Sequence, residues 1–178
     1  TLVLYRGLKL REPRTVALAL LTAAGFILRW QTLCNYWNVP LEGDSAGYWD
    51  FARALTLSNP FANAHREPGL IWTLRLAKTL FGDSERSSRF LSLLLSCSLI
   101  PLTWLLGQRA RLGTAACLIA AGLAAFNPFS VFMSAQGSQL ELFTFLILLF
   151  SALWLDGRAG AAGTAGAALI LTRLQSAA

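Results

Sequence analysis

Charge is scarce in this sequence, and four long stretches carry none of it. Only 13% of the 178 residues are charged and 55% are hydrophobic, against about 45–50% apolar residues in a usual soluble domain. The charge-free stretches are residues 90–108, 112–140, 142–155 and 159–172. Because roughly 20 helical residues cross about 30 Å of hydrocarbon, this pattern excludes an ordinary soluble domain. It predicts an all-α, polytopic helical membrane protein embedded in the lipid bilayer.

Cysteine, histidine and acidic residues are also few. The three cysteines are odd in number and lack metal-ligand spacing, so neither a disulfide framework nor a metal site follows from them. Basic residues outnumber acidic ones by 15 to 9, but they flank the apolar stretches and form no single stripe. That distribution is typical of the positive-inside rule and argues against a nucleic-acid partner.

The N-terminal region has no cleavage site typical of a signal peptide. Four basic residues precede an apolar run that continues past Cys34, which is the pattern of a signal anchor. The chain begins at Thr1, and Met133 is its only methionine. We therefore expect residues 1–178 to be the N-terminal part of one larger transmembrane domain. The basic residues are Arg6, Lys9, Arg11 and Arg14.

About five transmembrane helices are predicted, with a long polar loop after the first. Pro101 and Pro128 are expected to kink the helices that contain them. Arg29, inside the first span, is expected to extend toward the outer interface beside Trp30. Residues 34–89 are expected to form the first extracytoplasmic loop. The predicted spans are residues 15–33, 90–108, 113–133, 140–155 and 159–174.

The segment 70–81 decides this topology. It is apolar but only about twelve residues long. Arg75 and Lys78 lie on one helical stripe, and an apolar stripe is formed by Leu70, Leu74, Ala77 and Phe81. A crossing would place both cations near the middle of the bilayer, at about 2.5–3.5 kcal/mol each. We therefore expect a juxtamembrane helix whose cations face phosphate headgroups. The count of spans then places Asp44 and Glu141 on the same outer side.

Asp44 and Glu141 each lie where a predicted helix begins. The apolar residues of 48–55 recur at helical spacing, so a second interfacial helix is predicted, with Asp44 or Ser45 as its N-cap. Asp44 could cap this helix or deprotonate a hydroxyl nucleophile. These roles are compatible because a cap holds its carboxylate rigidly. Glu141 leaves a similar choice, between complementing a helix dipole and serving as a second acid.

The C-terminal part of the first loop contains three further candidate site residues, and each has two possible roles. His65 is a surface residue more often than a base or ligand. Arg66 has a planar fork that suits a phosphate, either of a substrate or of a lipid headgroup. Glu67 is a candidate substrate contact or simply begins the helix at Pro68, because an acid and a proline suit that end.

Several short motifs occur in a definite order along the chain. They are Asp44-x-x-x-Tyr48, Phe51-Ala52-Arg53, Glu67-Pro68, Leu80-Phe81-Gly82-Asp83-Ser84, Arg89, Gly107-Gln108-Arg109, Pro128 and Glu141. Together they resemble the GT-C membrane glycosyltransferases, and within these the protein O-mannosyltransferase-like and lipid A aminoarabinose transferase-like enzymes. The resemblance extends over about residues 14–175 and matches the N-terminal portion of such an enzyme.

This resemblance implies an inverting transfer of sugar from a polyprenyl-phosphate donor to a glycan, lipid or protein acceptor at the extracytoplasmic face. It implies the plasma (inner) membrane of a bacterium or archaeon, and a fragment that is inactive alone. Two acids and one histidine allow a divalent cation without requiring it. Asp44 becomes the candidate base and Glu141 the second acid. The candidate substrate-binding residues are Tyr48, Arg53, His65, Arg66 and Glu67.

Two other classes of protein share this topology: a transporter or flippase subunit, and a non-catalytic membrane assembly protein. Transporters tend to place ionisable groups and broken helices near the middle of the membrane. The spans predicted here carry their charges mostly at their ends, which favours the enzyme. A labelled lipid-linked sugar incubated with the full-length protein would separate the three classes, since only the enzyme makes glycosylated product.

Overall fold

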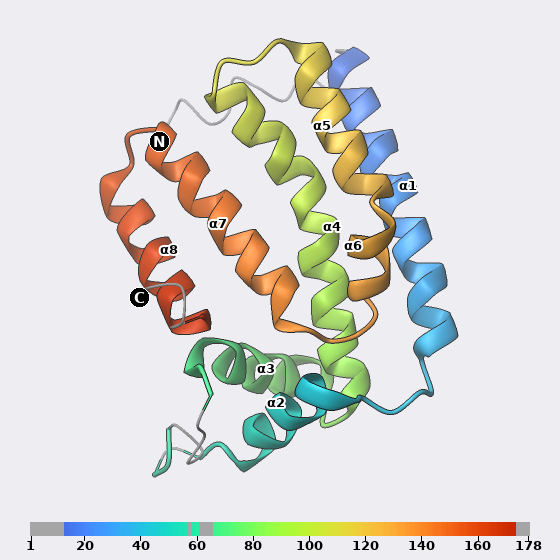
Figure 1. Ribbon diagram of the computed structural model, residues 1–178, viewed down its shortest axis with the longest axis vertical. Coiled ribbons are helices and arrows are strands. Elements are labelled where there is room, and N and C mark those ends of the chain that lie inside the picture. The colour runs from blue at the N-terminus through green and yellow to red at the C-terminus, as the bar shows by residue number, and fades with distance from the viewer. Residues whose placement is uncertain (1–12, 57, 61–65, 174–178) are drawn as a thin grey trace.

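The computed structural model of the chain describes residues 13–56, 58–60 and 66–173. These residues form eight α-helices, which confirms the all-α prediction (Figure 1). Most of the elements match the predicted segments to within a few residues. The helices are α1 (Pro13–Tyr36), α2 (Gly43–Ala54), α3 (Pro68–Phe81), α4 (Glu85–Arg109), α5 (Thr114–Phe126), α6 (Pro128–Met133), α7 (Gln139–Leu155) and α8 (Ala159–Thr172).

Two helices, α1 and α4, are long and apolar enough to cross a membrane, with 24 and 25 residues. The helices α5, α7 and α8 are also apolar but have 13, 17 and 14 residues. Because a crossing takes roughly 20 residues, helix length does not confirm all five predicted spans.

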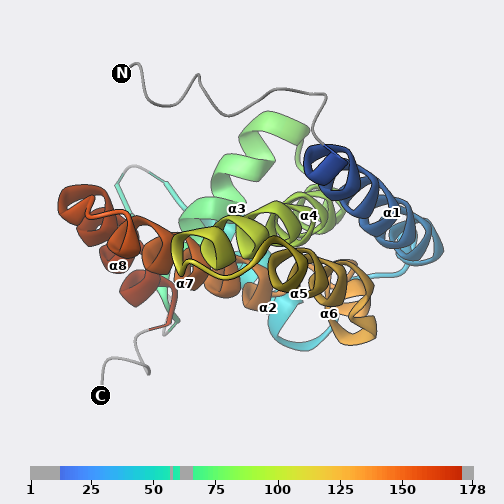
Figure 2. The same cartoon turned by 90° about the horizontal axis from the view of Figure 1, so that it is seen from above.

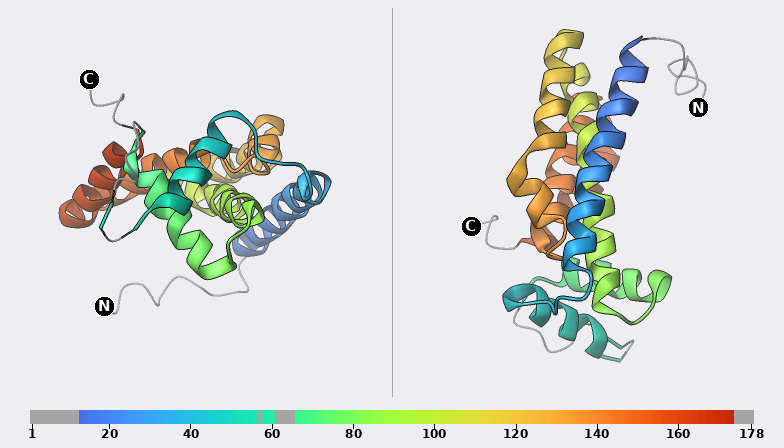
Figure 3. Two further views of the ribbon diagram at one scale, coloured as in Figure 1. Left: turned by 90° about the horizontal axis from the view of Figure 1, so that it is seen from below. Right: turned by 90° about the vertical axis from the view of Figure 1, so that its right-hand side faces the viewer.

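The apolar helices lie side by side, and α2 and α3 lie across one end of the bundle (Figures 1 and 3). Helix α4 occupies the middle and packs against α1, α3, α5, α6 and α7 (Figure 2). Consecutive long helices run in opposite directions. The α1–α2 link, the start of α4 and the α6–α7 loop therefore meet at the same end of the molecule.

Helix α3 is the predicted juxtamembrane segment, and it lies across the bundle instead of alongside it (Figure 1). Three members of its predicted apolar stripe, Leu70, Leu74 and Ala77, are buried, and the first two pack against α2. The fourth member, Phe81, is instead largely exposed and meets Phe90 edge to face, with ring centroids 5.0 Å apart. The cations Arg75 and Lys78 are only partly exposed, and the exposed positions of α3 include the apolar Leu76 and Leu80.

The predicted span at 113–133 is not one kinked helix but two helices. Helix α5 ends at Phe126, and Asn127 is the N-cap of α6, accepting a hydrogen bond from the Ser130 amide at 3.1 Å. Pro128 occupies the first position of α6. Proline disfavours helical geometry in the residue before it and has no amide hydrogen to donate. The helix therefore stops at Asn127 and starts again.

Arg29 does not extend toward the interface beside Trp30, so that prediction was wrong. The side chain is fully buried between helices, and its Nε donates to Ser96 Oγ at 2.8 Å. Its two terminal nitrogens donate to the carbonyls of Ala125 and Ala124 at 2.8 and 2.9 Å. These carbonyls belong to the last turn of α5, where no further helical amide can reach them. The break before Pro128 therefore creates the site that holds the arginine.

Candidate functional site

A pocket of about 400 Å³ lies where α2 meets the α6–α7 loop and the end of α8. Both loops that the sequence assigned to one outer side contribute to its wall. The pocket is lined by Asp44, Ser45, Tyr48, Met133, Gln136, Ser138, Gln139, Leu140, Phe143 and Arg173. Its wall therefore combines a carboxylate, a phenol, amides and a guanidinium with a few apolar side chains, which suits a polar ligand.

Asp44 stands at this pocket with its carboxylate paired to Arg66, at 2.8 Å between Oδ1 and Nη1. The prediction that Asp44 or Ser45 is the N-cap was wrong. Helix α2 begins one residue earlier, at Gly43, with Glu42 as N-cap and no side-chain cap. The Asp44 carboxylate is therefore available to another group, and its side chain is 74% exposed. The hydrogen bond to Asp44 raises the pKa of Arg66.

Tyr48 lies beside this ion pair and links α2 to α3 and α7. Its hydroxyl donates to Glu67 Oε2 at 2.6 Å and lies 3.0 Å from Gln139 Oε1. The Arg66 guanidinium covers the ring, 4.9 Å from its centroid. Burial, with the Glu67 hydrogen bond second, raises the pKa of Tyr48 to about 12. Tyr48 therefore stays protonated and acts as a hydrogen-bond donor at neutral pH.

Glu67 begins α3, which is one of the two roles that the sequence left open for it, and its contact with a substrate stays a prediction. Its backbone forms the N-cap of α3, with Pro68 at the first helical position. Its side chain does not cap the helix and instead accepts a hydrogen bond from the Tyr48 hydroxyl. Asp44, Tyr48, Arg66 and Glu67 thus form one connected group, brought together from the two ends of the first loop.

Glu141 lies at the same end of the molecule but does not line the pocket. It is 2% exposed, and its Oε2 accepts a hydrogen bond from Ser138 Oγ at 2.9 Å. Ser138 is also the N-cap of α7, since its Oγ accepts from the Leu140 amide at 3.3 Å. The spacing of Ser138 and Glu141 is that of a capping box, but the Glu141 carboxylate bonds the hydroxyl of the cap and not its main-chain amide. Ser138 therefore separates the Glu141 carboxylate from the pocket.

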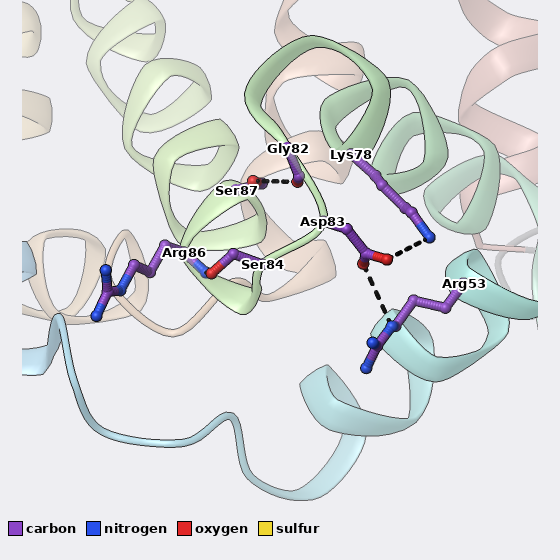
Figure 4. A network of polar contacts seen from close by, with 7 residues as sticks. All are labelled: Arg53, Lys78, Gly82, Asp83, Ser84, Arg86 and Ser87. Carbon is purple, nitrogen blue, oxygen red and sulfur yellow. Dashed lines mark hydrogen bonds and ion pairs between the residues drawn. The ribbon is translucent and has the colours of Figure 1, made fainter.

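Arg53 is not brought to the pocket. Its Nε pairs with Asp83 Oδ1 at 3.3 Å, and Lys78 binds the other carboxylate oxygen at 2.8 Å (Figure 4). The hydrogen bond from Lys78 holds the pKa of Asp83 below its usual value, and the charge of Arg53 acts in the same direction. This cluster joins the end of α2 to α3 and to the turn before α4. It therefore orients α2 and α3 relative to the start of α4.

His65 lies outside the described residues. Among those that are described, no three His, Cys, Asp or Glu side chains gather as a metal site would require. The two candidate acids do not converge, because Asp44 is paired with Arg66 and Glu141 with Ser138. The arrangement of these carboxylates therefore does not fit a shared divalent cation.

Of the ten residues that line the pocket, only Asp44 and Tyr48 were candidates from the sequence, and the polar residues that it missed include Ser138, Gln139 and Arg173. Arg173 lies directly after α8, and its guanidinium covers the Phe143 ring at 5.1 Å from the centroid. A cation after an apolar run is common at the end of any span. The position of Arg173 in the sequence therefore did not indicate that it lines a pocket. Ser138 with Glu141 three residues later is a capping-box pattern, and that signal was present in the sequence.

These features define a helical protein with apolar helices and a polar pocket at one end of its bundle. The family model for dolichyl-phosphate-mannose-protein mannosyltransferase matches residues 65–174, more than half of the chain. The chain therefore belongs to this family of GT-C membrane glycosyltransferases, and the resemblance seen in the sequence is confirmed. No curated protein and no solved structure matches the chain.

Membership of this family implies a glycosyltransferase that uses a polyprenyl-phosphate-linked sugar. Together with the two long apolar helices, it indicates an integral membrane protein. The matched range begins after α2, so it includes Arg66, Glu67 and Glu141 but excludes Asp44 and Tyr48. The contact of Arg66 with both of these residues ties the first loop to the matched region.

Proposed function

We propose that this chain carries the acceptor-activating site of an inverting glycosyltransferase. The donor is a sugar on polyprenyl phosphate, and the acceptor is a hydroxyl of a glycan, lipid or protein. The observation that carries the proposal is the position of Asp44, whose exposed carboxylate is held by Arg66 at the wall of a polar pocket. Family membership supports the reaction class.

Asp44 is the general base of this proposal. Its carboxylate accepts the proton of the acceptor hydroxyl as the acceptor oxygen attacks the anomeric carbon of the sugar. The bond between that carbon and the phosphate oxygen breaks, and its electron pair leaves with the phosphate. A single displacement of this kind inverts the anomeric configuration. Arg66 fixes one oxygen of Asp44, so that the other remains directed to the substrate.

The leaving group needs charge neutralisation more than it needs a proton, because a phosphate is already a weak base. Fixed cations beside the departing oxygen stabilise the charge that develops there. Arg66 and Arg173 are the pocket-side cations that we assign to this role. Tyr48, fixed by Glu67, would orient the substrate as a neutral donor. Glu141 would contribute through Ser138, whose hydroxyl it holds at the wall.

We further propose that the end carrying α2 and α3 faces outward and that the five apolar helices all cross the bilayer. The opposite end carries Arg109 and Arg111 in a short turn, as the positive-inside rule prefers for the cytoplasmic side. Nucleotide sugars are cytoplasmic, so an outward-facing site needs a donor that brings its own phosphate across the membrane. The location that we propose for the enzyme is the plasma membrane of a bacterium or archaeon.

Asp44→Asn tests the assignment of the base. In the full-length protein this variant should lower sugar transfer from a labelled lipid-linked donor by about 10²–10⁴-fold, the usual contribution of a general base. Expression should stay unchanged, because Asp44 is exposed. Asp50→Asn is the matched control, since it removes the same charge from an exposed position of α2. Unchanged turnover of Asp44→Asn would remove this residue from the mechanism.

A further inference from the structure

The guanidinium of Arg89 is buried at the start of α4 and binds only main-chain carbonyls in the contacts that we describe. It is 1% exposed. One terminal nitrogen donates to the Ala135 carbonyl, in the turn after α6. The other donates to the carbonyls of Val39, at 2.6 Å, and Pro40, at 3.1 Å, in the link between α1 and α2. One side chain therefore ties two loops that lie almost a hundred residues apart in the sequence.

Two neighbours of Arg89 on the same helix hold the same two loops. Glu85 Oε2 accepts a hydrogen bond from the Leu41 amide at 2.8 Å. Ser88 Oγ donates to the Gly137 carbonyl at 3.4 Å. Gly137 has φ +66°, and a Cβ there would lie 2.6 Å from Ser88 Oγ. The α6–α7 loop therefore approaches α4 as closely as its backbone allows.

These two loops lead directly into the two walls of the polar pocket. The α1–α2 link passes into α2, which presents Asp44 and Tyr48, and the α6–α7 loop presents Gln136 and Ser138. No residue of α4 is among those that line the pocket. The spacing between the walls is nevertheless set from α4, because each wall begins at a loop that Arg89 holds.

We propose that Arg89 is a positioning residue that sets the distance between the proposed base and the opposite wall of the pocket. This inference rests on the proposed function. Arginine suits the task because its planar fork presents five donors in a fixed geometry, whereas lysine is a point charge on a flexible stem. A carbonyl at a helix end or in a turn carries partial negative charge. Several such carbonyls can therefore bind a buried guanidinium in place of a carboxylate.

A second pocket makes the proposal testable by chemical rescue. This pocket, of about 270 Å³, is lined by Val39, Pro40, Arg86 and Arg89, together with Trp37, Asn38, Ser84 and Glu85. Truncation of Arg89 to alanine would extend it to the three carbonyls. A free guanidinium ion could then enter and restore the lost hydrogen bonds, which it would not do for a variant that merely misfolds.

The first arm of the experiment measures transfer by the full-length protein with labelled lipid-linked sugar. Arg89→Ala should lower kcat by about 100-fold, the effect expected when a reacting group moves by about 1 Å. Millimolar guanidinium chloride should restore a large part of this loss, and Arg89→Lys should retain more activity than Arg89→Ala. Arg111→Ala, which removes an exposed arginine from the turn between α4 and α5 at the other end of the bundle, should keep its activity and show no guanidinium response.

The second arm does not depend on activity. Ala135 is fully buried, so a cysteine placed there, with exposed Cys34 replaced by serine, should react slowly with a maleimide. Arg89→Ala should expose this cysteine, and guanidinium should protect it again. Wild-type protein that protects the cysteine but transfers no sugar would refute the proposed function while the positioning contacts stand.

Two results would overturn the inference about Arg89. In the first, wild-type protein transfers sugar and Arg89→Ala keeps both the wild-type kcat and the protection of the cysteine. In the second, Arg89→Ala loses activity and protection and guanidinium restores neither, which is the behaviour of a residue needed only for folding. Restoration of both together supports a positioning role.

Discussion

Arg66 contacts two side chains of the pocket at once, Asp44 and Tyr48. One face of its guanidinium covers the Tyr48 ring, while one of its nitrogens binds Asp44. Tyr48 in turn is fixed by Glu67, the residue next to Arg66 in the sequence. The solvent-exposed base is thereby held by Arg66, which packs on a Tyr48 ring that Glu67 fixes in turn. This order matters for chemistry, since a general base must lie within hydrogen-bond reach of the proton that it removes.

Tyr48→Phe tests the contribution of this phenol. The variant leaves the Glu67 carboxylate without its short hydrogen bond and should lower the free energy of unfolding by roughly 1.5–3 kcal/mol, as for hydrogen bonds to charged groups. Thermal unfolding of the full-length protein in detergent measures this change. Tyr36→Phe is the control, because it keeps the edge contact with Phe132 and leaves Glu67 paired.

The same variant should change the alkaline pH dependence of stability. The folded protein keeps the Tyr48 proton up to a pKa of about 12, against 10.0 for the ordinary phenol. Between these values the unfolded chain binds fewer protons than the folded one, so stability from this group falls as pH rises from about 10 to about 12. Tyr48→Phe should remove that decline. An unchanged slope would show that the phenol is not perturbed.

Among the secondary-structure elements, the break between α5 and α6 depends most on a distant residue. Pro128 and Asn127 stop α5 locally, but the carbonyls left at its end are satisfied by Arg29 from α1. Arg29 also binds Ser96 on α4. Three helices are thus joined at the point where one of them ends, which makes a polar break tolerable inside an apolar bundle.

Arg29→Leu should therefore be far more destabilising than removal of an exposed arginine. It leaves the carbonyls of Ala124 and Ala125 without their donor, and we expect a loss of about 3–5 kcal/mol, as for the removal of one member of a buried charged group. Arg109→Leu, which breaks an exposed ion pair with Asp156 at the other end of the molecule, should cost about 0–1 kcal/mol. Equal costs in thermal unfolding would contradict the buried role of Arg29.

The bundle exposes apolar side chains around its sides, and the ion pairs of the described residues lie near its two ends. Large apolar residues on the outer surface include Leu20, Ile119, Leu123, Phe129 and Trp154. A soluble monomer rarely exposes a continuous apolar surface, whereas helices in a bilayer direct such residues to lipid. The shape of the bundle and its surface therefore agree with the membrane family to which the chain belongs.

Cysteine labelling tests the proposed orientation of this bundle. Glu42→Cys and Gln136→Cys lie at the end that carries α2 and α3, whereas Ala110→Cys and Ala159→Cys lie at the opposite end. In a variant without native cysteines, an impermeant maleimide should label the first pair from outside the cell and the second pair only after lysis. Labelling of Glu42→Cys and Gln136→Cys from different compartments would refute a common outward-facing site.

Periodicity and charge placement were enough to predict the helical class, a short amphipathic helix over 70–81 and the meeting of the two polar loops. These features depend on local pattern, because an apolar stripe or a proline acts on its own segment. The family followed from the order of short motifs. The spacing of Ser138 and Glu141, which is typical of a helix start, was also visible in the sequence. Glu141 was nevertheless assigned as the candidate second acid.

The partners of long polar side chains were not predictable in this way. Arg29 was expected at the interface and is buried, Arg53 binds Asp83 instead of joining the pocket, and Arg89 received no role. Each of these arginines reaches across to another element, so its partner depends on which helices pack together and at what height. The local sequence pattern does not specify contacts between distant elements. These contacts were determined by the packing of α1, α2 and α4 against their neighbours.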